Sequence, residues 1–202
     1  MQDLRRLEQR KAAFIGDYSC QIQLGYKSSD VKNPAFTDLK DDLVEILSLS
    51  CAENVFLHNP ADKHDTHVAV AIRSIGAMRS LPEDKRPRRV FGVEVWRSLD
   101  WLCDDEKIAL DSSQRKNLAS ALLGVFDSQI TGGKRYDLAA MGRRLANATF
   151  YASHSTDVSD SFIYAIDLTP LVKEPSMSVE ELTLRAIDRF KDDVQRRIRM
   201  LS

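Results

Sequence analysis

One stretch of the sequence decides the fold, NVFLHNPADKHDTHVAVAI, which covers residues 54–72. It opens with a short apolar run, Asn54-Val-Phe-Leu57, which is typical of a buried strand. Between about position 66 and position 79 the apolar residues recur at helical spacing, namely Val68, Ile72, Ile75 and Met78. Leu81-Pro82 ends this helix. The polar loop between strand and helix therefore lies at the carboxyl end of a strand, where open α/β folds bind their ligands.

Outward from this stretch the sequence predicts strands that alternate with helices. The expected strands cover 19–24, 89–96, 108–110 and 161–166. One expected helix ends at Gly16 in a left-handed cap, and another begins after Thr37. Further helices are expected from a capping box at Asp111 to about 128 and over 137–151. The final helix covers 178–201 and opens at Ser178. Such alternation favours parallel strands with helices on both faces. We expect an α/β, Rossmann-like layered fold with a mostly parallel sheet, in a single domain over 1–202.

The composition excludes several classes of function. The 29 Lys and Arg residues balance 30 Asp and Glu residues to a net charge of -1, so a nucleic-acid partner is not expected. No apolar run approaches the roughly 20 residues that a membrane span needs, and no secretory signal opens the chain, so we expect a cytoplasmic protein without a membrane partner. The three cysteines contain no Cys-x-x-Cys pair and are expected to be small buried hydrophobes.

The polar loop after the first apolar run holds three of the four histidines, His58, His64 and His67, within ten residues. His64 and His67 stand three apart at the first turn of a helix, so both side chains can face one ion or one substrate atom. Asp62 and Asp65 add carboxylate oxygens that can bind a metal or orient an imidazole. The alternative interpretation is that these groups only cap the helix, which needs one acceptor and no imidazole.

The loop also resembles a known family. Asp62-x-His64-x-x-His67, followed by Val-Ala-Val-Ala-Ile, is similar to the second motif of the PIG-L/LmbE-like zinc-dependent N-deacetylases, which remove acetyl groups from amino sugars in larger conjugates. The resemblance covers nearly the whole chain. It includes Arg5-x-x-Glu8-x-x-x-Ala12-Ala13-x-x-Gly16 near the start, and Val95–Leu102, Asp127-Ser-Gln129 and Tyr136-Asp137-x-Ala139-x-x-Gly142-Arg143 downstream.

The resemblance implies a role for each residue of the loop. His67 matches the histidine that binds zinc or another divalent metal, and His64 matches the histidine that stabilises or protonates the reacting amide. Thr66 stands where many members carry Asp, so Asp62 or Asp65 would have to supply the catalytic carboxylate. The implied substrate is a small-molecule N-acetyl amino sugar (N-acetylglucosaminyl) conjugate.

The family's first motif, His-Pro-Asp-Asp-Glu, does not occur in this sequence. That motif follows the first strand and supplies two zinc ligands and the general base. The chain therefore resembles an amino-terminally truncated deacetylase that lacks the first strand, with an incomplete metal site. The alternative hypothesis is a non-catalytic remnant that binds a carbohydrate or a protein partner.

Residues further along the chain complete the candidate site. Trp96 and Arg97 end a predicted strand and can contact a sugar or an anionic group, and His154 follows a predicted helix; a core Trp, a structural Arg and a surface His remain alternatives. The final helix carries an apolar stripe, Ile187, Phe190, Val194, Ile198 and Leu201, among basic residues. We expect the stripe to pack on its own domain; if it is exposed, the chain is expected to form a homo-oligomer.

Overall fold

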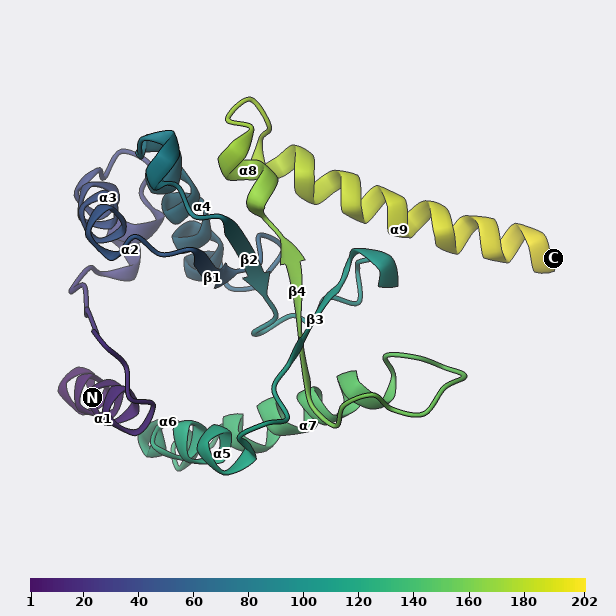
Figure 1. The fold of residues 1–202 in the computed structure, drawn as a ribbon, viewed down its shortest axis with the longest axis horizontal. Coiled ribbons are helices and arrows are strands. Elements are labelled where there is room, and N and C mark those ends of the chain that lie inside the picture. The colour runs from purple at the N-terminus through teal and green to yellow at the C-terminus, as the bar shows by residue number, and fades with distance from the viewer. The chain divides into compact units, whose positions relative to one another are not determined.

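The computed structural model describes all of residues 1–202, and contacts divide them into two compact units (Figure 1). The first unit combines Met1–Gly25 with Leu110–Ile163, and the second combines Tyr26–Ala109 with Tyr164–Ser202. Each unit is therefore built from two separate segments of the chain. The single domain expected over 1–202 stays a prediction.

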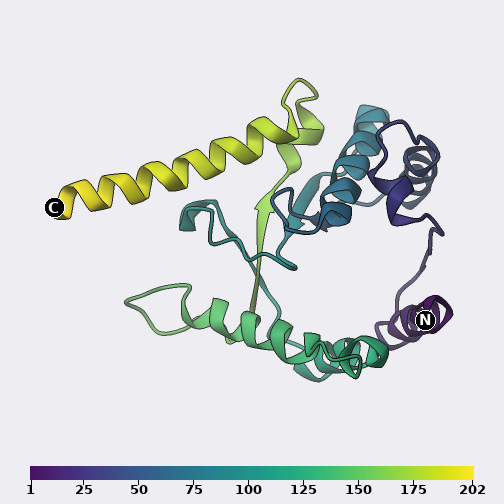
Figure 2. The ribbon, with the colours of Figure 1, turned by 180° about the vertical axis from the view of Figure 1, so that it is seen from behind.

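The helices and strands are seen from two sides in Figures 1 and 2. The helices of the first unit are α1 (Gln2–Ile15), α5 (Lys116–Gly124), α6 (Asp127–Ile130) and α7 (Tyr136–Thr149). Those of the second are α2 (Ser28–Lys32), α3 (Asp38–Ser50), α4 (Asp65–Ser80), α8 (Thr169–Lys173) and α9 (Val179–Leu201), with short 3-10 helices η1 (Glu83–Lys85) and η2 (Asp104–Glu106). The strands are β1 (Asn54–His58), β2 (Arg89–Val93), β3 (Ile108–Asp111) and β4 (Phe162–Asp167). None of the helices combines the length and apolar character that crossing a membrane requires.

The sheet has the strand order β1-β2-β4-β3 and is mixed. β1 and β2 are parallel, from Asn54 opposite Arg89 to His58 opposite Val93, as expected for strands joined through the crossover helix α4. β2 and β4 are antiparallel, with Phe91 opposite Asp167. The α/β class is confirmed, but a mostly parallel sheet is not observed. The reason is connectivity, because no single crossover helix joins β2 to β4.

The core of the second unit lies between α4 and the strands. Ile75 and Met78 of α4 are almost fully buried, together with Val90 of β2 and Leu171 of α8. The predicted stripe on α4 is correct only in its second half, since Ile72 is 45% exposed. Small residues replace it on the buried face, which α4 fills with Ala71, Ser74 and Ala77.

Two arginines connect the end of α4 to α8. The Arg79 guanidinium donates to the carbonyl oxygens of Leu171 and Met177, both at 2.5 Å. Arg86 donates to the carbonyl oxygens of Leu81 at 3.1 Å and Arg79 at 3.0 Å, and more weakly to that of Val172 at 3.4 Å. Together they satisfy carbonyl groups at the end of α4 and around α8. Arg86 is thus a structural residue, whereas its basic neighbours Lys85, Arg88 and Arg89 are exposed.

We expect Arg86→Met to lower the free energy of unfolding by about 1–3 kcal/mol, because several carbonyl groups lose a charged donor. The matched control is Arg88→Met two residues away, which is exposed and should change stability by less than about 0.5 kcal/mol. Urea denaturation of both variants measures the difference. Equal stabilities of the two variants would contradict the structural role of Arg86.

The first unit is held by a buried carboxylate on α1. Glu8 is 3% exposed, and its two oxygens accept hydrogen bonds from the Ser128 amide and hydroxyl, both at 2.7 Å. These two hydrogen bonds lower the pKa of Glu8, and the one from the backbone amide has the larger effect. The positive charges of Lys11 and Arg5 lower it a little further. Glu8 therefore ties α1 to the first turn of α6.

Since the pKa of Glu8 is lower in the folded than in the unfolded chain, its stabilisation is present above the unfolded pKa and is lost as the pH falls through the folded pKa. We expect Glu8→Gln to lower the urea midpoint at pH 7 and to flatten the loss of stability below about pH 5. Asp3→Asn, an exposed change on the same helix, is the control and should keep the parent's pH profile. A parent-like profile for Glu8→Gln would refute the assignment.

The expectation that the cysteines are buried is wrong, since Cys20 and Cys51 are exposed and Cys103 is half-buried. Three predictions of local backbone structure are wrong as well. Gly16 is not left-handed, with φ at -82°, but any side chain there would overlap the ring of Tyr18; the following Asp17 takes the positive φ of 52°. The expected strand over 19–24 does not form, because no neighbouring strand completes a ladder with it. Asp111 does not cap a helix, since its Oδ1 accepts from the Ser113 amide and the Ser159 hydroxyl, and α5 begins only at Lys116.

Candidate metal centre

The candidate centre begins where β1 ends, at His58. The next residue, Asn59, is fully buried and fixes the loop to the end of β2: its backbone amide and its side-chain amide both donate to the Val93 carbonyl oxygen, at 3.3 and 3.2 Å. Its side-chain oxygen accepts from the Ala61 amide. The loop therefore leaves the strand in one defined direction and brings Asp62 to the backbone of Trp96.

Asp62 contacts three other residues around this loop. Its side chain is fully buried, and Oδ1 accepts from the His64 amide at 3.1 Å while Oδ2 accepts from the Trp96 amide at 3.2 Å. Oδ2 also lies 3.5 Å from Nδ1 of His67. One carboxylate thus joins the loop after β1, the chain after β2 and the first turn of α4.

The imidazoles form a stack beside this carboxylate. The rings of His58 and His67 are nearly parallel with centroids 3.9 Å apart, and His64 follows at 4.8 Å from His67. The Trp96 ring lies 5.9 Å from His64, and Nζ of Lys63 lies 5.4 Å from the centre of the Trp96 ring. Burial, together with the neighbouring His67, lowers the pKa of His58. His58 is therefore neutral at pH 7, the form that binds metals.

The residues present fit a divalent metal ion. Ligand atoms from His58, Asp62 and His67 all lie within 4.8 Å of one another. Nδ1 of His58 and Nδ1 of His67 are buried and make no hydrogen bond, although buried polar atoms almost always find a partner. Two imidazole nitrogens and one carboxylate oxygen are a donor set used by catalytic zinc, which keeps a further position for water.

The structure brings together only part of the predicted site. His67 and Asp62 lie together as expected, and sequence reasoning missed His58, although it is the first of the three clustered histidines. His64 and Asp65 are exposed at the start of α4. No side chain caps α4, whose N-cap residue is His64, so the capping interpretation is not observed. Thr66 shares a hydrogen bond with Ser28, 2.6 Å between the hydroxyl oxygens.

The three predicted substrate residues fall in different places. Trp96 lies beside the cluster, since its backbone amide donates a hydrogen bond to Asp62 and its ring contacts that of His64. Arg97 is the next residue and is exposed. His154 is an exposed residue of the loop after α7, in the first unit. The assignment of all three to substrate binding stays a prediction.

Comparison with known proteins identifies a related fold. No family model matches this chain, and no curated protein matches it. The crystal structure of GalB, the 4-carboxy-2-hydroxymuconate hydratase from Pseudomonas putida, is similar, with a TM-score of 0.52 and 16% sequence identity over 82% of this chain and 71% of that chain. At this identity the similarity shows a shared fold and transfers no activity.

We expect the purified protein to bind one equivalent of Zn²⁺ or another divalent metal, and His58→Ala and His67→Ala each to weaken binding at least about tenfold. Titration calorimetry and metal analysis after dialysis measure this. His154→Ala, the histidine of the other unit, is the matched control and should bind like the parent. Equal metal content in all four proteins would exclude the site.

Proposed function

We propose that this chain is a PIG-L/LmbE-like, metal-dependent N-deacetylase that acts on an N-acetyl amino sugar conjugate. The proposal rests on one observation above all: His58, Asp62 and His67 converge beside an exposed histidine, His64, at the carboxyl end of β1. A metal held there would activate water and polarise the acetyl carbonyl. The order of residues, Asp62-x-His64-x-x-His67, is the one that the family resemblance implies.

The chain's own side chains divide the remaining work. Asp62 has both oxygens engaged by backbone amides, so its carboxylate is held in place beside His67 as the oxygen ligand of the cluster. His64 is exposed on the stack and can donate a proton to the departing amine or to the carbonyl oxygen. Asp65 is exposed on the first turn of α4, and it is the candidate for taking a proton from water.

The fold is compatible with the finer part of the proposal, an LmbE-like layered sheet without its first strand. β1 lies at the edge of the sheet, and Phe56 on it is 56% exposed, stacked on Phe91 with ring centroids 5.1 Å apart. β1 is thus an edge strand that pairs with β2 alone. Trp96 offers an apolar face to a sugar ring next to His64.

The test is acetate release from N-acetylglucosaminyl conjugates by the Zn²⁺-loaded protein. We expect turnover that disappears after chelation, and a fall in kcat of about 10²–10⁴-fold in His64→Ala with metal content unchanged. Arg73→Ala, a change on α4 away from the cluster, is the control and should keep the parent's kcat.

A second outcome would favour the alternative function. If the protein binds one equivalent of metal but releases no acetate from any conjugate, the deacetylase proposal fails. Binding of the same conjugates, measured by calorimetry, would then support a non-catalytic carbohydrate-binding role. Absence of both would favour a protein-binding role instead.

A further inference from the structure

The last helix, α9, carries an apolar surface that its own unit does not cover. Of its 23 residues only Leu182 and Ala186 are buried. The stripe predicted from the sequence is exposed along its length, at 36% for Ile187 and Phe190, 37% for Val194, 60% for Ile198 and 81% for Leu201. The expectation that this stripe packs on its own domain is therefore wrong. An apolar stripe of this length on a helix rich in charge is typical of a helix that pairs.

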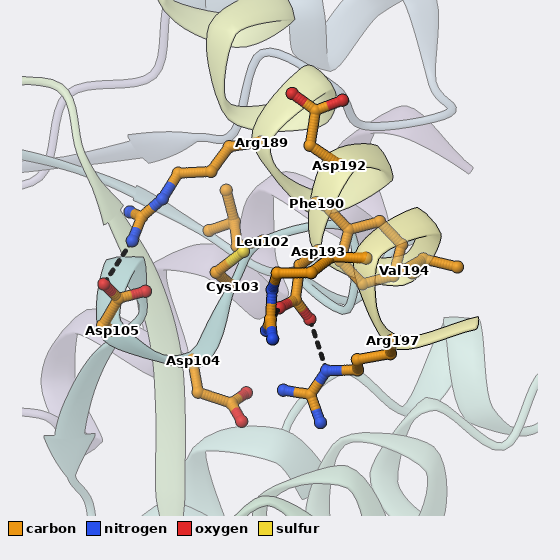
Figure 3. Close-up of a pocket in the computed structure, with 11 residues that line it drawn as sticks. Leu102, Cys103, Asp104, Asp105, Arg189, Phe190, Asp192, Asp193, Val194 and Arg197 are labelled. Carbon is orange, nitrogen blue, oxygen red and sulfur yellow. Dashed lines mark hydrogen bonds and ion pairs between the residues drawn. The ribbon is translucent and has the colours of Figure 1, made fainter. Parts of the chain in front are cut away.

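A groove runs beside the stripe, between α9 and the loop that contains η2 (Figure 3). Its volume is about 780 Å³, and Leu102, Phe190 and Val194 give it an apolar lining. Ion pairs join the two walls of the groove. Arg189 of α9 pairs with Asp105 of the loop, and its guanidinium lies 3.3 Å from the Glu106 carboxylate. The groove thus extends the apolar surface sideways from the stripe.

The charges of α9 show which helix can cover this surface. In an antiparallel pair of α9 helices that cross at Val194, the helical repeat sets Phe190 opposite Ile198 and Ile187 opposite Leu201 of the second copy. Asp193 and Arg197 lie on one flank of the stripe, next to the groove. Each Asp193 then faces Arg197 of the second copy. A parallel pair would instead set the basic run Arg196-Arg197-Ile198-Arg199 against itself, and like charges at such positions repel.

We propose that this protein self-associates through α9, which pairs antiparallel with α9 of a second copy across the stripe. Met200, which is 69% exposed, lies one turn beyond Arg196 and Arg197 of the groove wall and, in this register, falls opposite Asp188, next to Arg189 of the second copy's groove. Asp193 already bonds Arg196 and Arg197 within its own helix, so its carboxylate is held in position for Arg197 of the second copy. The inference is independent of the proposed function.

Sedimentation or light scattering tests the pair. We expect the parent to be a dimer, and Val194→Glu to raise the dissociation constant more than tenfold because two carboxylates meet at the crossing point. Leu184→Glu is the matched control: Leu184 is an apolar residue of α9, 49% exposed, beyond the end of the paired segment. It should leave the dimer intact. A monomeric parent, or equal dissociation constants for the two variants, would overturn the proposal.

A charge exchange separates pairing from effects within one helix. Asp193→Arg alone and Arg197→Asp alone should each be monomeric, because the charges at both flank positions then have one sign. Mixing the two variants should restore a heterodimer, since the flank of one variant is basic, that of the other is acidic, and the two attract across the interface. Interactions within a single helix cannot produce that recovery. If mixing changes nothing, the proposed pair is wrong.

Orientation is read from cross-linking in a background with the three native cysteines replaced by serine. Ile187→Cys copies mixed with Leu201→Cys copies should form the mixed disulfide in the antiparallel pair. Disulfides between two Ile187→Cys copies, with no mixed product, would show a parallel pair and contradict the proposed arrangement.

Discussion

The buried carboxylate of Asp62 is the interaction on which the candidate site depends. It accepts two backbone hydrogen bonds, from His64 and Trp96, and faces Nδ1 of His67 at 3.5 Å. Because a buried carboxylate without partners costs several kcal/mol, the chain segments that carry those partners must keep their places. Asn59 performs the same task earlier in the loop, through the Val93 carbonyl. The side chains of Asn59 and Asp62 therefore fix the backbone of the loop, and the path of the loop in turn positions the imidazoles.

Local sequence patterns predicted the elements that bound this cluster, and two of its three members, Asp62 and His67. The apolar run at 54–57 and the helical spacing after it correspond to β1 and α4, and Ser178 caps α9 through the Glu181 amide as expected. The direction of β4 could not be predicted, because it depends on a long connection rather than on a local pattern. His58 was missed for a similar reason. It reaches His67 through the path of the loop, which Asn59 and Asp62 determine and which spacing alone does not reveal.

Two of the predictions that failed share one cause, the absence of a partner. Residues 19–24 alternate like a strand, yet Ile22 is 54% exposed and the Gln23 side chain bonds the Arg6 carbonyl instead. The stripe on α9 is amphipathic like that of a packed helix, yet its own unit covers only Leu182 and Ala186. The periodicity of apolar residues indicates that a segment has an apolar face. It does not state which surface covers that face, and this is decided by tertiary contacts or by another copy of the chain.

Many of the contacts that hold this structure depend on only one of the two residues that make them. Arg79, Arg86 and Asn59 donate to carbonyl oxygens, and Thr169 accepts from the Val90 amide, so their partners are backbone groups that any sequence supplies. Only one residue of each such pair has to be kept for the tie to persist, whereas a side-chain pair requires both. The apolar core tolerates exchange of residues at constant volume. A metal ligand set, in contrast, requires particular side chains at fixed positions, so a shared fold does not imply a shared function.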